Sequence, residues 1–324
     1  MTKRKIVSII GTGVIGAGWA ARFIACGYIV QAYDPNKNSL TKLKFDVKKA
    51  LQSLKKIGLN ENASIKNLLC FNKIEDSLKN TSFIQENAPE NEKIKKLLLQ
   101  KIDSLVDKKI IIASSSSGLL PTTIQSGCKY PERVLIGHPF NPVYLLPLVE
   151  IVKGKKTSET SANKAKKIYE AIGMKPLKVK KEIEGYISDR LQEAVWRESL
   201  HLIKDGIATT EEIDDAIVYG PGLRWAFMGI CLTFHLAGGE TGMKHMLEQF
   251  GPALKLPWTK LKAPRLDKKL KNLMISGTKK QAGKYSIDDL EKQRDIFLIE
   301  IMKTLNHHQK NRFPNWKMKY NNFK

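Results

Sequence analysis

The glycine-rich segment from Gly11 to Gly16, with the sequence GTGVIG, constrains the fold of this chain more than any other feature. It follows an apolar run, Lys5–Ile10, that predicts a short buried strand, and it opens a run, Val14–Cys26, that predicts a helix. Glycines at this spacing allow a tight turn, a close approach of the backbone to a phosphate, and close packing of helix on strand. The segment therefore predicts a strand–turn–helix unit that binds a dinucleotide, with the helix N-terminus facing the pyrophosphate.

The cofactor is predicted by Asp34, which stands directly after a second expected strand, Tyr28–Tyr33. A carboxylate at this place accepts hydrogen bonds from the adenosine ribose and repels a 2′-phosphate, so NAD is expected rather than NADP. Pro35 and Asn36 follow, and neither can hold that phosphate as an arginine would. The expected cofactor-binding residues are Gly11, Thr12, Gly13, Val14, Ile15, Gly16 and Asp34.

Strand and helix signals alternate through the first half of the chain. Further strands are expected at Ser82–Asn87, Lys109–Ser114, Arg133–Gly137, Pro147–Val152 and Pro176–Val179, with helices at 39–57, 91–106 and 158–172. This alternation predicts an α/β fold of the Rossmann type, with a doubly wound parallel sheet. After about residue 181 only helices are indicated, at 185–205, 210–219, 225–236, 242–250, 268–276 and 287–305. We expect an NAD-binding domain over residues 1–182 and an all-α substrate-binding and dimerisation domain over residues 183–324.

Composition excludes some classes of protein. The 324 residues are 42% hydrophobic and 27% charged, as in ordinary globular chains. The net charge of +23 would suit a nucleic-acid-binding protein, but no nucleic-acid-binding motif accompanies it and the lysines are spread along the chain, so no nucleic-acid partner is expected. Cys26, Cys70, Cys128 and Cys231 lie far apart, which predicts no metal site and no disulfide framework and fits the cytoplasm.

A signal peptide or membrane span is the alternative interpretation of the N-terminal apolar stretch. Lys3, Arg4 and Lys5 precede a stretch to Tyr33 in which Arg22 is the one charged residue. Four glycines between residues 11 and 18 interrupt it, and glycine is unfavourable in an isolated helix. The strand–turn–helix interpretation accounts for both the glycines and Arg22, so no membrane association is expected.

A catalytic pair is predicted by His138 and Glu150. His138 lies in the turn-rich sequence GHPFNP, where core packing explains it poorly, and Glu150 interrupts the apolar run 146–152. A carboxylate within a buried strand is costly unless it is paired. Glu150 would then orient the imidazole of His138, which would act as a general base. The serine run 114–117 follows a predicted parallel strand, where such sheets bind ligands, so that Ser117 could hold a reacting oxygen or simply form a turn.

Five separated strings resemble the 3-hydroxyacyl-CoA dehydrogenase superfamily over nearly the whole chain. They are SSSSG, GHPFNPVYLLPLVEIV, ISDRLQEAVWRE, DGIATTEEIDDAI and GLRWAFMG. The resemblance implies that His138 and Glu150 are the catalytic pair and that Ser117 contacts the substrate oxygen. It also implies cofactor contacts at Glu90, Lys95 and Asn141, and a homodimer formed by the helical domain.

Two departures within the resemblance bear on the substrate. The acyl-CoA enzymes have Asn where this chain has Asp189, and Gly-Pro-Phe where it has the sequence MGICL from Met228. Both differences match the branch of the family that oxidises the 3-hydroxyl of carnitine. L-Gulonate is the alternative substrate, because the lambda-crystallin-like relatives that oxidise it also resemble this chain, although they tend to have Asn at the position of Asp189.

Carnitine carries a trimethylammonium group that cannot donate hydrogen bonds, so aromatic faces and carboxylates are expected to bind it. The candidate substrate-binding residues are Asp189, Trp196, Trp225, Phe227 and Tyr144. Arg197 and Arg224 are alternatives for holding the carboxylate of the substrate. Each aromatic side chain is equally well explained by core packing.

Overall fold

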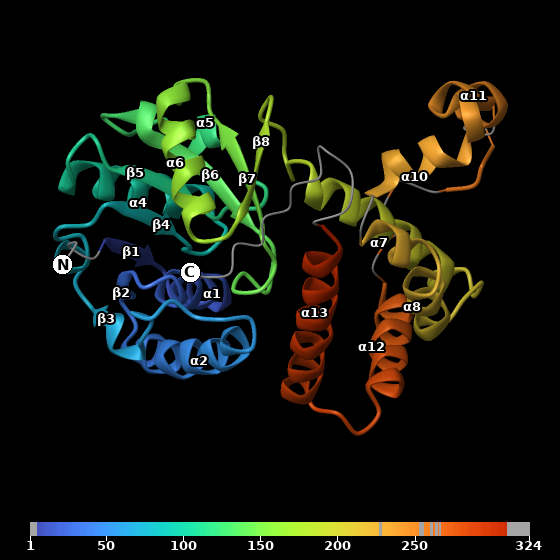
Figure 1. Ribbon diagram of the computed structural model, residues 1–324, viewed down its shortest axis with the longest axis horizontal. Helices are drawn as coiled ribbons and strands as arrows, with labels where there is room; N and C mark the ends of the chain where they lie inside the picture. Colours follow the sequence, from blue (N-terminus) through green and yellow to red (C-terminus); the bar gives the residue numbers. More distant parts are fainter. Residues whose placement is uncertain are drawn as a thin grey trace. The chain divides into compact units, whose positions relative to one another are not determined.

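The computed structural model describes residues 5–226, 229–252, 256–259, 262, 265 and 267–309. Contacts divide them into two compact units (Figure 1). The first contains residues 5–187 and 294–309, and the second contains the described residues of 188–293. The predicted division placed all of 183–324 in the second domain, whereas residues 294–309 group with the first unit, because Ile299 and Met302 are buried in its core. No helix of the described ranges is long and apolar enough to cross a membrane.

The first unit is built on an eight-stranded sheet with the strand order β3-β2-β1-β4-β5-β6-β7-β8. Its strands are β1 (Ile6–Ile10), β2 (Ile29–Tyr33), β3 (Leu68–Phe71), β4 (Phe83–Glu86), β5 (Ile111–Ser114), β6 (Val134–Pro139), β7 (Leu148–Lys153) and β8 (Lys175–Val179). The predicted Rossmann-type fold is confirmed, since β1 to β6 are parallel. The sheet is mostly parallel, and one pair departs from this pattern, because β7 runs antiparallel to β6. Strand β3 was not predicted.

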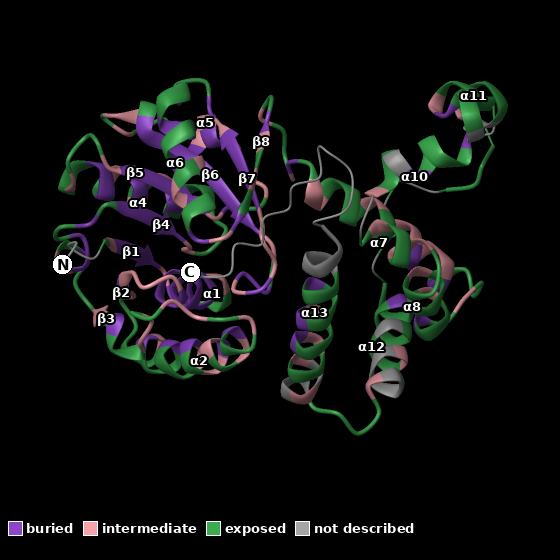
Figure 2. Cartoon of the chain, viewed as in Figure 1, coloured by how far each residue is buried: buried purple, intermediate pink, exposed green. Residues whose placement is uncertain are grey.

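Helices cover both faces of this sheet. One core cluster contains side chains of α1 (Val14–Ala25), α2 (Lys37–Lys55) and α6 (Glu159–Ala171), and the other contains side chains of α3 (Ile74–Ser77), α4 (Glu92–Leu105) and α5 (Pro121–Ile124). Successive strand residues alternate between the clusters, as the pleat requires: Ile9 belongs to the first and Ile10 to the second. Figure 2 shows the strands of this unit as largely buried, so the sheet is the core of a doubly wound domain.

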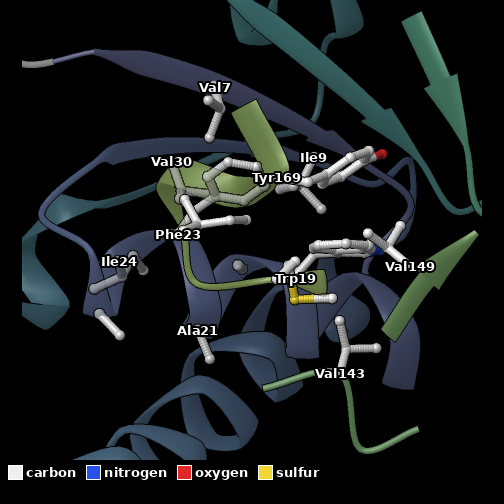
Figure 3. Packing of buried hydrophobic residues seen from close by; sticks show 14 of the residues in the cluster. Val7, Ile9, Trp19, Ala21, Phe23, Ile24, Val30, Val143, Val149 and Tyr169 are labelled. Atoms are coloured by element: carbon white, nitrogen blue, oxygen red, sulfur yellow. The ribbon is translucent and has the colours of Figure 1, made fainter. Parts of the chain in front are cut away.

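Helix α1 lies deep in the first cluster, where Trp19, Phe23 and Tyr169 pack together (Figure 3). The rings of Trp19 and Tyr169 have centroids 5.3 Å apart. Small residues allow the close approach of the helix: a Cβ on Gly18 would lie 2.8 Å from the Cβ of Val143. The predicted strand–turn–helix is therefore confirmed.

Arg22, the charged residue of the apolar N-terminal stretch, is buried on α1 and binds backbone carbonyls. Its guanidinium donates to the carbonyl oxygens of Tyr144 at 2.9 Å, Ile172 at 3.0 Å and Gly173 at 2.6 Å. The five N–H donors of an arginine satisfy several acceptors at once. Arg22 thereby joins α1 to the segment after β6 and to the end of α6.

Side-chain caps define the start of several helices. Asn36, Asn91 and Ser158 accept hydrogen bonds from backbone amides of α2, α4 and α6. A capping box of Thr209 with Glu212 begins α8 (Thr210–Val218). Such caps stabilise a helix by about 1 kcal/mol each.

The second unit is helical over its described residues, as predicted. It contains α7 (Ser188–Lys204), α8, α9 (Pro221–Trp225), α10 (Gly229–Ala237), α11 (Met243–Phe250), α12 (Lys268–Ala282) and the start of α13 (Ile287–Gln309). Two predicted helices differ from the structure. The one expected from Gly185 begins at Ser188, because Gly185 and Tyr186 have φ of +70° and +47°. The one expected at 225–236 is divided, with α9 ending at Trp225 and α10 beginning at Gly229, whose φ is +69°.

Candidate active site

The predicted functional segments of the first unit meet at one edge of the sheet. Strands β1, β2, β4, β5 and β6 are parallel, so their carboxyl ends lie at the same edge. The glycine turn follows β1, Asp34 follows β2, the segment 87–91 follows β4 and the serine run ends β5. The strand order reverses between β1 and β4, and ligands of doubly wound sheets bind at such a point.

The three glycines of the turn have different surroundings. Gly11 has φ +89°, and a Cβ there would lie 2.6 Å from the carbonyl oxygen of Asn87. A Cβ on Gly16 would collide with the carbonyl oxygen of Gly11. A Cβ on Gly13, by contrast, would meet no protein atom within 4 Å. The space next to Gly13, beside the first turn of α1, is therefore open for a phosphate to approach the backbone.

Asp34 is held toward this turn. Its carboxylate accepts hydrogen bonds from the backbone amide of Thr12 at 3.1 Å, from the hydroxyl of Thr12 at 2.9 Å and from the amide of Asn36 at 2.9 Å. The side chain is half-buried, so that its orientation is fixed while it can still accept hydrogen bonds from a ribose. These residues fit the adenosine half of NAD.

Lys95, expected as a cofactor contact, is an internal ion-pair partner in the structure. Its ammonium lies 2.9 Å from Oε1 of Glu86 and 2.9 Å from the carbonyl oxygen of Ala88, and both charged side chains are buried. Glu86 also accepts hydrogen bonds from the hydroxyl of Ser114 and the amide of Ala88. No role was predicted for Glu86. The sequence could have indicated this ion pair, because an acidic residue ends an apolar strand and a lysine follows nine residues later.

Glu90, the second expected cofactor contact, binds the serine loop, defined here as residues 114–118. Its Oε1 accepts hydrogen bonds from the hydroxyl of Ser116 and from the amides of Ser117 and Gly118, both at 3.1 Å. Burial raises the pKa of Glu90, but these hydrogen bonds and the charge of Lys95 outweigh burial and lower the pKa below its usual value. Glu90 thereby fixes the backbone that carries the exposed side chain of Ser117.

The antiparallel pairing of β6 with β7 places His138 directly opposite Glu150. Nδ1 of His138 lies 3.0 Å from Oε2 of Glu150, and both side chains are buried. Because a carboxylate only accepts hydrogen bonds, Nδ1 carries the hydrogen, and Nε2 is the basic nitrogen of the neutral ring. The second oxygen of Glu150 accepts a hydrogen bond from the amide of Ile187 at 3.0 Å. Both oxygens of the buried carboxylate are thus engaged, and the contact with Ile187 was not predicted.

Two expected site residues follow β6. Asn141 is exposed, next to Pro142, in the connection from β6 to β7. The hydroxyl of Tyr144 donates to Asp295 at 2.7 Å, and Asp295 also accepts from Ser53 of α2 at 2.9 Å. Burial and the carboxylate of Asp295 raise the pKa of Tyr144 well above its usual value. Tyr144 therefore links the connection between β6 and β7 to α13 through its hydroxyl.

The second unit brings Trp196 and Trp225 to the same apolar pocket of about 700 Å³. The pocket is lined by Leu191, Gln192, Val195, Trp196, Ser199, Ile203, Thr210, Ile213, Asp214, Ile217, Val218, Trp225, Gly229 and Ile230. Asp189 is half-buried at the start of α7 and is not part of that lining. Phe227 lies outside the described residues.

A dinucleotide-type glycine turn and a buried histidine–carboxylate pair on the same Rossmann-type sheet define the class of the protein as a nicotinamide-dependent dehydrogenase. Residues 6–183 match the NAD-binding domain of 3-hydroxyacyl-CoA dehydrogenase, and residues 185–286 match its C-terminal domain. The chain belongs to the 3-hydroxyacyl-CoA dehydrogenase family, and its first domain is an NAD-binding domain.

Relatives within this family are similar over most of their length. An L-carnitine dehydrogenase of Bacillus cereus is 53% identical, over 93% of this chain and 92% of its own. An L-carnitine dehydrogenase of Pseudomonas putida is 50% identical, over 94% and 95%. Among solved structures, FHMPC 5-dehydrogenase, an NAD+-dependent dismutase, is 25% identical with a TM-score of 0.79, over 94% of this chain and 99% of its own.

Proposed function

We propose that this protein oxidises L-carnitine to 3-dehydrocarnitine with NAD. The observation that carries this proposal is the identity of about half of all residues to several L-carnitine dehydrogenases over more than nine-tenths of the chain. The His138–Glu150 pair supplies the chemistry that oxidation of a hydroxyl requires, and the glycine turn with Asp34 supplies the place for the cofactor.

In the proposed mechanism, Nε2 of His138 takes the proton of the substrate hydroxyl. NAD held by the glycine turn and Asp34 would supply the acceptor for the hydride that leaves the same carbon. Glu150 keeps the imidazole in the required tautomer and stabilises the imidazolium that forms. The hydroxyl of Ser117 donates a hydrogen bond to the substrate oxygen, from a loop that Glu90 holds in place.

The substrate is tested by measuring NAD reduction with L-carnitine, 3-hydroxybutyrate and L-gulonate. 3-Hydroxybutyrate keeps the hydroxyl and the carboxylate of carnitine but lacks its ammonium group. We expect kcat/KM for L-carnitine to exceed that for 3-hydroxybutyrate by at least about 30-fold, since contacts to a quaternary ammonium contribute on the order of 2 kcal/mol. A preference for L-gulonate, or equal turnover of carnitine and 3-hydroxybutyrate, would overturn the carnitine assignment.

The catalytic pair is tested by His138→Ala and Glu150→Gln. We expect the first to lower kcat by about 10²–10⁴-fold, the usual contribution of a general base. Glu150→Gln should lower kcat by about 10-fold or more, because an amide stabilises the imidazolium less than a carboxylate does. Both variants should keep the wild-type affinity for NAD, measured by fluorescence titration. Near-normal turnover of His138→Ala would exclude His138 as the base.

The ammonium site is proposed to involve Asp189 and the two tryptophans of the apolar pocket. The support is the juxtaposition of Trp196 with Trp225 and the negative charge of Asp189, which suits a cation. Asp189→Asn and Trp225→Leu should lower kcat/KM for carnitine more than for 3-hydroxybutyrate. An equal effect on both substrates would mean that these side chains do not recognise the ammonium group.

A homodimer formed by the helical unit is also proposed. The support is a set of exposed apolar side chains on α9 and α10, Leu223, Phe234 and Leu236, which are 65%, 43% and 58% exposed and do not line the apolar pocket. Faces of this kind usually mark an interface, and closed twofold dimers are the commonest assembly. Leu223→Glu should convert a dimer to a monomer in light scattering. Ile207→Glu, at an apolar position that is 71% exposed and precedes α8, should leave the mass unchanged.

The cytoplasm is the proposed compartment. The support is the wide separation of the four cysteines, all of which are free thiols in the structure. Fractionation with activity recovered in a membrane or secreted fraction would contradict it.

A further inference from the structure

The segment 185–187 lies against the catalytic pair and has no place in the mechanism described above. Tyr186 is completely buried, although its backbone has φ +47°, a conformation that few non-glycine residues adopt. Strained residues of this kind persist where the surrounding structure holds them, and they cluster at functional sites. The contact of Tyr186 with His138 indicates which function this backbone conformation serves.

The phenol ring of Tyr186 packs on the imidazole of His138. The two ring centroids are 5.4 Å apart with an interplanar angle of 59°. Across the pairing of β6 with β7, Glu150 binds Nδ1 of the same imidazole. The backbone amide of Ile187, the residue after Tyr186, donates to the other oxygen of Glu150. The segment therefore contacts both members of the pair, through a side chain and through the backbone.

The hydroxyl of Tyr186 extends this contact to the serine loop. It donates to the carbonyl oxygen of Leu119 at 2.9 Å, and the amide of Leu119 donates to the hydroxyl of Ser116 at 3.1 Å. Ser116 in turn donates to Glu90, which also holds Ser117. Tyr186 is thus in contact with the group proposed to take the proton and is connected to the loop proposed to bind the same oxygen.

We infer that Tyr186 is a positioning residue of the reaction: its ring fixes the orientation of the His138 imidazole, and its hydroxyl fixes the distance between His138 and the serine loop. This inference rests on the proposed function only through the role of His138 as the base. Both interactions need the positive φ of Tyr186, because that conformation directs the side chain toward His138 and the following amide toward Glu150.

The experiment separates the ring from the hydroxyl. Tyr186→Leu and Tyr186→Gly remove the ring, and glycine adopts the positive φ readily. Circular dichroism of each variant shows which of them retains the fold. We expect both to lower kcat about 10-fold or more, since misplacement by about 1 Å costs up to about 10²-fold, with NAD affinity unchanged. Tyr186→Phe should restore kcat to within about 3-fold of the wild type while raising KM, because it keeps the ring and loses the tie to Leu119.

A matched control is Tyr169, which is equally buried and donates its hydroxyl to Gln85 at 2.6 Å, within the other core cluster. Tyr169→Phe should lower thermal stability and change kcat far less than Tyr186→Leu does, because Gln85 keeps its hydrogen bonds to Ser115 and to the carbonyl oxygen of Gly137. Wild-type kcat in either ring-less variant, or a kcat loss matched by an equal loss of NAD affinity, would overturn the inference. So would a Tyr186→Phe variant as impaired as Tyr186→Leu.

A second readout does not depend on turnover. Diethyl pyrocarbonate acylates accessible imidazole nitrogens, and mass spectrometry of the peptide containing His138 measures the rate at that residue. The rate should rise several-fold in Tyr186→Leu and Tyr186→Gly and stay unchanged in Tyr186→Phe, with the exposed His245 as internal reference. An unchanged rate in the ring-less variants would refute the packing role. If the wild type oxidised none of the tested hydroxy acids, the proposed function would fail while this assay still reported on Tyr186.

Discussion

At the residue scale, the glycines of the turn are alike in the sequence but are required for different reasons. Gly11 and Gly16 are enclosed by backbone atoms, whereas Gly13 borders open space and has an ordinary negative φ of −64°. Gly13→Ala should therefore leave thermal stability nearly unchanged and weaken NAD binding by about 10-fold or more, because its methyl group occupies the space that a pyrophosphate needs. Calorimetric titration with NAD measures the affinity.

Gly16→Ala is the matched control for this prediction. Its methyl group would collide with the carbonyl oxygen of Gly11, so that it should lower stability and not only affinity. If Gly13→Ala bound NAD as tightly as the wild type, the turn would not hold the pyrophosphate in the way proposed.

The lowered pKa of Glu90 predicts that the stability of the protein depends on pH. Its folded-state pKa lies below the ordinary value of 4.5, since hydrogen bonds from Ser116 and Gly118 and the charge of Lys95 outweigh burial. The stabilisation by the ionised group is therefore present above pH 4.5 and is lost as the pH falls through the lowered pKa. Glu90→Gln should be less stable than the wild type near neutral pH, and the difference should shrink in acid.

Urea unfolding at several pH values measures this difference. Glu92→Gln is the control, because Glu92 forms an exposed pair with Lys96 and such pairs contribute at most about 0.5 kcal/mol. A difference for Glu90→Gln that stayed constant from neutral to acid pH would show that its charge does not hold the serine loop.

At the element scale, α1 depends on a buried charge. Arg22 donates to carbonyl oxygens of Tyr144, Ile172 and Gly173, and a neutral replacement leaves these acceptors without the guanidinium. Arg22→Met should destabilise the protein by about 3 kcal/mol, which lowers the unfolding midpoint by roughly 6–12 °C for a unit of this size. Differential scanning calorimetry measures the shift. Arg197→Met, which removes an exposed pair with Glu193, should shift it by little, and equal shifts would contradict the argument.

Most elements were predictable because their signals are local. The apolar strands that were predicted and the glycine turn depend on neighbouring residues, and the structure has them. The direction of β7 was not predictable in this way. A short apolar sequence is compatible with parallel and antiparallel pairing, and the tertiary structure decides that β7 pairs antiparallel with β6. The start of α7 differs from the prediction for a related reason: the sequence predicts a helix from Gly185, whereas Gly185 and the buried Tyr186 both have positive φ.

The site was predictable where charged residues interrupt apolar strands. Glu150 and His138 were found because a buried acid requires a partner, and the structure pairs them. Glu86 was missed although it obeys the same rule, because it ends a strand instead of interrupting one. Tyr186 carries no signal in the sequence, since an aromatic residue near a helix start is usually core.

At the scale of the whole molecule, the proposed active site does not explain the net charge of +23. Such a charge attracts any polyanion without recognising it. The protein should therefore be retained on DNA at about 50 mM salt and released at about 200 mM, while DNA leaves NAD reduction unaffected at the higher salt. A gel shift and an absorbance assay measure the two effects, and a salt-resistant complex with one DNA sequence would contradict this view.

The antiparallel ladder between β6 and β7 has a consequence for how such an enzyme changes its substrate over evolution. His138 and Glu150 are aligned by main-chain register, and Arg22 binds the connection between the strands through its carbonyl oxygens. Neither interaction involves the side chain of Leu146, whereas the ring of Phe140 lies against the imidazole of His138, with centroids 5.9 Å apart. An exchange at Leu146 therefore leaves the pairing of His138 with Glu150 in place, but an exchange at Phe140 removes a ring contact of the imidazole. Divergence within a family built this way is thus expected at positions such as Leu146 before positions such as Phe140.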